Sequence, residues 1–479
     1  MVKRAKQIKL IILVGIVGAI LLLSFLLLQI KIPVFGKTTV DLLVSNGTVL
    51  TMNSQKKIIP NGAVAVRDGK IIAVGLTKAL EQAYKAKKII NASGGVIMPG
   101  LINAHTHTAM TLFRGFADDM PLMEWLQKYI FPAEKKHVTP EFVYWGTKLA
   151  CYEMIKGGTT TFVDMYFFED SVAQAAYEMG MRAIVGETII EFPTPDSKNY
   201  KQALEQTKKL VEKWKNNPLI TPAIAPHAPY TSSKEMLLAI KSFAEKYDVP
   251  VITHVCETKS GINQVISKHK MRPVKFLDSI GLLNKRLIAA HCVHLTDNEI
   301  ALLAQKKVGV AHCPVSNMKL SSGIATVYKM LKTGVLVGLG TDGAASNNSL
   351  DMFGEMKTAA LLQKVATGKP TALNAYQTLE LATIGSARAI HMGNKIGSLE
   401  PGKKADIIVV AIDQIHQIPV YHVASQLVYA SKAPDVQTVI INGKIIMRDR
   451  VIGTKGQEEE LRKKVEHFKK SIVDTKNSE

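Results

Sequence analysis

Cysteine is scarce in this sequence: four residues in 479, with no Cys-x-x-Cys pair. This excludes a disulfide scaffold, a zinc ribbon and a thioredoxin-type motif. Acidic residues are also few, 40 against 60 lysines and arginines, which leaves a formal net charge of +20. No arginine-rich arm or interleaving of basic and aromatic residues occurs, so nucleic acid is not an expected partner. Hydrophobic residues make up 47% of the chain, which predicts a folded core large enough for an enzyme.

One stretch, residues 10–28, is apolar for long enough to cross a bilayer, and four basic residues precede it. Residues 1–37 are therefore predicted to be an N-terminal membrane anchor. The positive-inside tendency puts the N-terminus in the cytoplasm and the catalytic domain on the far side of the membrane. A cleaved signal peptide is the alternative, although no Ala-x-Ala-like site follows the apolar run.

The rest of the chain shows two kinds of pattern. Short strands with Asp-Gly or Asn-Gly turns fill residues 38–97 and 395–455, and we expect both parts to form one composite β-sandwich domain. Residues 98–394 alternate between strand and helix patterns, which predicts a (β/α)8 TIM barrel; a doubly wound open sheet is the alternative. The charges of residues 456–479 are typical of a solvated helix. The predicted fold class is α/β, with a transmembrane helix in front.

Polar residues stand where the predicted barrel strands end. The predicted strands are 96–104, 159–165, 182–190, 220–226, 249–254, 287–290, 308–312 and 335–340. The carboxyl ends of such strands form the active face of a barrel. These ends carry His105, His107, His227, His254, His291, His312 and Asp342. One histidine at a strand end is usually structural, but this gathering predicts a shared site.

Four of these side chains predict a metal site. His105 and His107 are two residues apart, so in a strand both point to the same face. His254 and Asp342 complete a shell of three nitrogens and one carboxylate with an open position for water. This donor set favours Zn²⁺, with Fe²⁺ or Mn²⁺ as alternatives, and such a metal brings the pKa of bound water to about 7. Residues 220–231 contain no bridging lysine, so one metal ion is predicted.

Two further residues are predicted to handle protons. His291 is placed to hydrogen-bond the attacking water, and Glu257 to carry a proton to a ring nitrogen or leaving group. Cys256, Cys292 and Cys313 stand beside the site histidines in the sequence and are interpreted as small buried packing residues.

Two glycine-rich patterns resemble nucleotide-binding motifs but are not interpreted as nucleotide sites. Residues 338–343 match the dinucleotide-binding pattern, but they follow the last predicted strand, and their aspartate is needed for the metal. Residues 397–404 resemble a P-loop without its Ser/Thr and are predicted to form a turn. The HExxH, G-x-S-x-G and H-x-E…P-C-x-x-C signatures are absent.

Five motifs occur in a set order: PGLINAHTH at 99–107, HVCET at 254–258, AHCVH at 290–294, AHCPVSN at 311–317 and GTDG at 340–343. Together they resemble the metal-dependent amidohydrolase superfamily. The nearest branch is the methylthioadenosine/S-adenosylhomocysteine deaminase-like group, with its triazine-hydrolase relatives. PGKKAD at 401–406 is similar to the return strand of that family's composite β-domain. The likeness covers about residues 40–450.

The resemblance also implies substrate contacts. It assigns the metal ligands to His105, His107, His254 and Asp342, and the substrate contacts to Glu134, His227 and Glu257, with Glu134 on the ribose hydroxyls and Glu257 at the purine edge. The family often has an arginine late in the third strand, where this chain has Glu187. Because a carboxylate does not bind a carboxylate, S-adenosylhomocysteine is not expected to be a good substrate.

The predicted function is a mononuclear metal-dependent hydrolytic deaminase of an amino-substituted heteroaromatic ring, foremost a 5′-methylthioadenosine-like nucleoside. Glu257 would protonate the ring, His291 would polarise the water, and Asp342 would pass a proton to the leaving amine. Triazine or cyclic-amide hydrolysis and guanine or cytosine deamination are alternatives, and a non-catalytic metal-binding or membrane-tethered module is a remote one. The expected partners are the small-molecule substrate and the membrane, and a homo-oligomer is compatible with the sequence.

Overall fold

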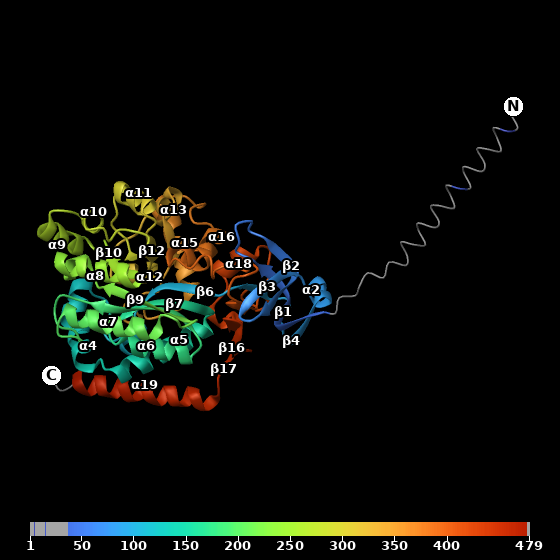
Figure 1. The fold of residues 1–479 in the computed structure, drawn as a ribbon, viewed down its shortest axis with the longest axis horizontal. Helices are drawn as coiled ribbons and strands as arrows, with labels where there is room; N and C mark the ends of the chain where they lie inside the picture. The colour runs from blue at the N-terminus through green and yellow to red at the C-terminus, as the bar shows by residue number, and fades with distance from the viewer. Residues whose placement is uncertain (1–3, 5–14, 16–36, 477–479) are drawn as a thin grey trace.

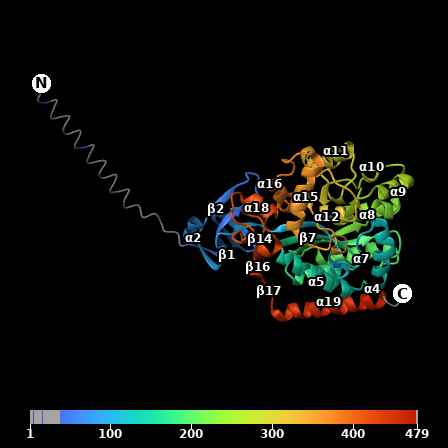
Figure 2. The same ribbon diagram turned by 180° about the vertical axis from the view of Figure 1, so that it is seen from behind.

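The computed structural model describes residues 4, 15 and 37–476, and Figures 1 and 2 show it from opposite sides. The predicted membrane anchor, residues 1–37, lies almost entirely outside the described residues. Within the described part of the chain, no helix combines the length and apolar character that a bilayer crossing requires.

Eight parallel strands form a nearly closed barrel, as the sequence predicted, in the order β13-β12-β11-β10-β9-β8-β7-β6. They are β6 (Leu101–Thr106), β7 (Thr159–Tyr166), β8 (Arg182–Ile189), β9 (Ile220–Pro226), β10 (Val251–Val255), β11 (Leu287–His291), β12 (Gly309–His312) and β13 (Leu336–Leu339). The seam beside β6 is held by residues that follow β13. The backbone N–H of Asp342 donates to the carbonyl of His105 at 3.0 Å, and that of Thr341 donates to Asn103 Oδ1 at 3.0 Å.

Helices surround this barrel (Figure 1). They include α5 (Pro140–Lys156), α6 (Glu169–Glu178), α7 (Tyr200–Trp214), α8 (Lys234–Tyr247), α9 (Lys259–His269), α10 (Pro273–Ser279), α11 (Asp297–Gln305), α12 (Pro314–Lys319), α13 (Val327–Thr333), α14 (Ala344–Asn347), α15 (Met352–Thr367), α16 (Ala375–Ala382), α17 (Ile384–Ala389) and α18 (Val423–Tyr429). Side-chain caps start several of them; at α11, Thr296 and Glu299 form a reciprocal capping box. Because helices cover the outside and side chains fill the inside, the strands are buried on both faces.

A second sheet, separate from the barrel, combines strands from both ends of the described chain. Its nine strands are β1 (Thr38–Leu50), β2 (Ile58–Arg67), β3 (Lys70–Leu76), β4 (Tyr84–Asn91), β5 (Val96–Pro99), β14 (Ile407–Val410), β15 (Val436–Ile441), β16 (Lys444–Arg448) and β17 (Val451–Ile452). The two ends meet where β5 pairs antiparallel with β14, with Met98 opposite Ile408. The short helix α2 (Thr77–Ala83) packs beside β2 and β3.

The expected single strand 96–104 is wrong in one respect, because it is two strands in two different sheets. β5 belongs to the composite sheet and β6 opens the barrel, and the chain changes sheets at Gly100. A Cβ atom at Gly100 would lie 2.1 Å from Oγ1 of Thr160 on β7. The absence of a side chain thus allows the two sheets to approach closely at this point.

The C-terminal residues, for which the sequence predicts a solvated helix, form the helix α19 (Lys455–Lys476). Figure 1 shows it lying along one side of the barrel, close to α5. The rings of Phe468 and Phe142 pack edge to face with centroids 5.5 Å apart, and Lys464 pairs with Glu141 at 2.9 Å. One face of the helix is therefore docked, and the other carries exposed charges.

Candidate metal centre and active site

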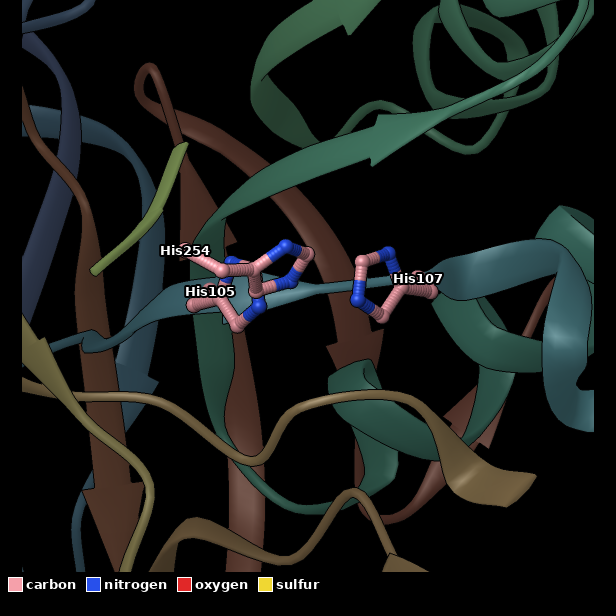
Figure 3. A group of neighbouring side chains, drawn as sticks. All are labelled: His105, His107 and His254. Atoms are coloured by element: carbon pink, nitrogen blue, oxygen red, sulfur yellow. The ribbon is translucent and has the colours of Figure 1, made fainter. Parts of the chain in front are cut away.

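Three imidazoles meet at the carboxyl end of the barrel (Figure 3). His105 lies on β6, His107 directly follows it, and His254 lies on β10. The ring centroid of His105 is 4.9 Å from that of His107 and 5.1 Å from that of His254. The ligand nitrogens of all three lie within 4.8 Å of one another, a spacing that one metal ion can bridge.

Asp342 joins this group from the turn after β13. Its Oδ1 lies 3.2 Å from His107 Nε2 and 3.6 Å from His105 Nε2. A ligand atom of Asp342 also lies within 4.8 Å of ligand nitrogens of His105 and His291. The four predicted metal ligands are thus brought together, and three nitrogens with one carboxylate form a donor set suited to zinc.

Backbone carbonyls orient two of the imidazoles. His107 Nδ1 donates to the carbonyl of Met165 at 2.6 Å, and His254 Nδ1 donates to that of His227 at 2.7 Å. These bonds make Nδ1 the hydrogen-bonding atom of each ring and turn Nε2 toward the site, as is usual for ligating histidines. Neither ring nitrogen of the buried His105 has a hydrogen-bond partner among the described residues. A metal ion would supply the partner that His105 lacks, so these residues fit such an ion.

The charge balance also suits a cation. Burial and the neighbouring imidazoles keep the pKa of His105 and of His254 well below the ordinary value, so both rings are neutral. Although burial works against it, the hydrogen bond with His107 and the nearby imidazoles keep the pKa of Asp342 low, so this group is ionised. Although burial works against it, the hydrogen bond with Asp342 raises the pKa of His107 to about 9. Metal binding requires neutral imidazoles and an ionised carboxylate, so a bound ion would displace the proton of His107.

Two predicted proton-handling groups lie beside the metal ligands. His291 Nε2 is 3.9 Å from Asp342 Oδ2 and 3.9 Å from Glu257 Oε2. His291 and Asp342 both have left-handed backbone conformations, with φ of 69° and 64°. Burial raises the pKa of Glu257, so this carboxyl group holds a proton more readily than an exposed one.

A cavity of about 620 Å³ opens over these groups. Besides the site residues it is lined by Met110, Leu122, Trp125, Leu126, Ile130, Phe131, Met165, Tyr166, Phe167, Thr188, Ile190, Tyr230, Leu320 and Ser346. Much of the apolar wall comes from the segment that contains α3 (Leu122–Glu124) and α4 (Phe131–His137). An apolar wall with a few polar groups on one side is typical of small-molecule sites.

All three predicted substrate contacts line this cavity: Glu134 from α4, His227 after β9, and Glu257 after β10. Burial raises the pKa of Glu134 to about 7 and lowers that of His227 to about 3. His227 is therefore neutral, and its Nδ1 lies 3.0 Å from Thr231 Oγ1.

Two residues that drew attention in the sequence lie elsewhere. Glu187 is buried on β8, where its carboxylate accepts a hydrogen bond from the backbone N–H of Glu169 at 3.1 Å, and it does not line the cavity. His312 is buried and also absent from the lining. Sequence reasoning missed Tyr166 and Trp125, because aromatic residues that face a cavity follow the same pattern as core residues.

A barrel with a histidine and aspartate metal centre at its carboxyl ends defines the class of metal-dependent barrel hydrolases. The model of the Amidohydrolase family matches residues 96–446. The chain belongs to this amidohydrolase family, as the sequence motifs predicted, and the family marks it as a hydrolytic enzyme that acts on carbon–nitrogen bonds.

Similar proteins match over nearly their whole length. The 5-methylthioadenosine/S-adenosylhomocysteine deaminase of Syntrophobacter fumaroxidans is 50% identical over 88% of this chain and 97% of its own. The 5′-deoxyadenosine deaminase of Methanosarcina acetivorans is 46% identical over 85% and 93%. The solved structure of an adenosine deaminase from Xanthomonas campestris with bound zinc is 40% identical, with a TM-score of 0.90, and covers 92% of this chain and 100% of its own.

Proposed function

We propose that this enzyme deaminates the purine ring of adenosine-type nucleosides by adding water and releasing ammonia. The observation that carries this proposal is the pairing of a histidine and aspartate metal centre with a buried Glu257 in the same cavity. Deamination needs a proton at a ring nitrogen as well as an attacking water, and Glu257 provides an acid close to the ligands. The names of the relatives support the same reaction.

His105, His107, His254 and Asp342 would hold one divalent ion, and zinc is proposed because of the donor set and the zinc-bound relative. When bound, such an ion supplies a water-derived nucleophile at neutral pH. Iron(II) and manganese(II) remain alternatives.

The remaining roles fall to side chains of this chain. Glu257 donates a proton to the ring nitrogen next to the amino-bearing carbon, which makes that carbon electrophilic. His291 accepts a hydrogen bond from the attacking water through Nε2. One proton of the water restores the acid form of Glu257, and Asp342 passes the other to the leaving amino group, which departs as ammonia and leaves a carbonyl on the ring. Glu134 binds the ribose hydroxyls, and His227 contacts the substrate from another wall of the cavity.

The cavity also favours an uncharged 5′ substituent such as methylthio or deoxy. Its wall includes Leu122, Trp125 and Phe131, and no lysine or arginine is among its lining residues in the described part of the chain. Burying a carboxylate there without a cation would cost several kcal/mol. This reason for disfavouring S-adenosylhomocysteine replaces the one based on Glu187.

Ammonia release from purified protein with measured metal content tests the proposal. The substrates are adenosine, 5′-deoxyadenosine, 5′-methylthioadenosine, guanine, cytosine and an amino-triazine. The expected result is turnover of the adenosines far above the other compounds. Turnover confined to the triazine or to the free bases would overturn the proposal in favour of those alternatives.

We further propose that residues 1–37 tether the enzyme to a membrane, with the catalytic domain outside the cytoplasm. The support is the apolar run at residues 10–28 with its preceding basic residues. The full-length protein should stay in the membrane pellet after a sodium carbonate wash. A soluble protein that has lost this segment would favour the cleaved signal peptide.

A further inference from the structure

The motif AHCPVSN at residues 311–317 has no role in the mechanism above, yet it leads into the active site. Its last residues lie on α12, and the chain continues through Leu320, which lines the cavity, to Ser322. Ser316, Asn317 and Ser322 are all buried, with 0%, 1% and 6% exposed. Buried hydroxyl and amide groups usually have hydrogen-bond partners. The two serine hydroxyls and the amide oxygen of Asn317 bond to the proton-handling groups, whereas Asn317 Nδ2 has no partner among the described residues.

Each of the three reaches a different proton-handling residue. Ser316 Oγ donates to Asp342 Oδ2 at 2.6 Å. His291 Nδ1 donates to Asn317 Oδ1 at 2.9 Å. Ser322 Oγ donates to Glu257 Oε1 at 3.4 Å.

These bonds determine which atoms of the three groups face the reaction. An amide oxygen only accepts, so Asn317 keeps the hydrogen of His291 on Nδ1 and leaves a lone pair on Nε2. The hydroxyl of Ser316 is bonded to Asp342 Oδ2, so Asp342 Oδ1 is the oxygen that faces His107 Nε2, at 3.2 Å. The hydroxyl of Ser322 is bonded to Glu257 Oε1, so Glu257 Oε2 is the oxygen that faces His291 Nε2, at 3.9 Å.

The segment is itself held in one shape. The backbone N–H of Ser322 donates to the carbonyl of Asn317 at 2.8 Å, and that of Asn317 donates to Cys313 O at 3.0 Å. The carboxylate of Glu355 on α15 accepts from Val315 N at 3.4 Å. A movement of residues 316–322 would thus reach all three proton-handling groups together.

We infer that residues 316–322 form a single positioning segment, in which Ser316, Asn317 and Ser322 set the proton-bearing atoms of Asp342, His291 and Glu257. None of the three lines the cavity, so they act through those groups and not on the substrate. The inference rests on the proposed deaminase activity. If wild-type protein with bound metal released no ammonia, the proposed function would be wrong. If the wild type were active and the variants below were unchanged, only this inference would be wrong.

The central test compares Asn317→Leu with Asn317→Asp. Leucine fills the same volume without an acceptor, whereas aspartate keeps an oxygen for His291 Nδ1. Asn317→Leu should lower kcat roughly 10- to 100-fold, as loss of an orienting partner does, with KM and zinc content unchanged. Asn317→Asp should recover most of kcat. Wild-type kcat in Asn317→Leu, or no recovery in Asn317→Asp, would overturn the inference.

Two serine variants make the test independent of how Asn317→Leu folds. Ser316→Ala should weaken zinc affinity roughly 10- to 100-fold in a chelator competition, and Ser322→Ala should lower kcat at constant KM. Ser431→Ala is the matched control, because its buried hydroxyl accepts a hydrogen bond from Gln417 Nε2 at 2.9 Å and neither residue lines the cavity. Serine variants that differ from wild type no more than this control would contradict the inference.

Discussion

Arg182 and Asp406 form a buried two-point ion pair between the barrel and the composite sheet. Arg182 Nε lies 2.8 Å from Asp406 Oδ2, and Nη2 lies 3.1 Å from Oδ1. Side-chain exposure is 5% for Arg182 and 4% for Asp406. Since Arg182 begins β8 and Asp406 precedes β14, the pair fixes one sheet against the other.

The first prediction concerns this pair. Asp406→Ala leaves a guanidinium buried without its partner, and we expect it to lower the free energy of unfolding by about 3–5 kcal/mol. Urea unfolding followed by circular dichroism measures the change. Asp449→Ala serves as the control, because Asp449 pairs with Arg448 in solvent with 83% of its side chain exposed. Equal stability losses in both variants would contradict a special role for the buried pair.

The second prediction concerns the metal centre. His254→Ala and Asp342→Ala should each lose bound metal and ammonia release together, because each removes one of the four donors. Dialysis of the wild type against a chelator should abolish turnover, and added zinc should restore it. Metal content is measured by mass spectrometry on the same samples as activity. Full activity in either variant would refute the ligand assignment.

The third prediction is a pH dependence of substrate binding. Burial raises the pKa of Glu134 to about 7, so the group becomes neutral as the pH falls through this value. A neutral carboxyl group accepts ribose hydroxyls less strongly, so KM should rise below pH 7 and level off above it. Glu134→Gln should lower kcat/KM roughly 10- to 100-fold and remove the dependence. If KM of Glu134→Gln showed the same pH dependence as the wild type, another group would be responsible for that dependence.

The fourth prediction concerns selectivity at the 5′ position. Because the lining residues include no lysine or arginine, kcat/KM for S-adenosylhomocysteine should fall at least roughly 100-fold below that for 5′-methylthioadenosine. Competition between the two nucleosides in one reaction gives this ratio directly. Comparable kcat/KM values for the two nucleosides would contradict this prediction, because they would show that the amino-acid part of S-adenosylhomocysteine remains in solvent.

The sequence was most informative where residue type and strand position agree. His105 and His254 could be assigned because imidazoles at the ends of parallel strands converge on one face of a barrel. The role of Ser316 could not be predicted, because small polar residues are common and their partners depend on tertiary packing. The change of sheet at Gly100 was missed for a related reason: the close approach of Thr160 depends on a distant strand. The docking of α19 was missed because its apolar contacts come from a few residues, among them Phe468 and Ile472, within a highly charged stretch.

The pairing of β5 with β14 has a consequence for synthesis on the ribosome. β5 is made before the barrel, whereas its neighbour β14 emerges after it. Until then one edge of β5 stays open in the nascent chain, and such an edge can recruit strands from other molecules. The nascent chain therefore passes through a stage in which β5 can pair with foreign strands, and this stage ends when residues 407–410 arrive.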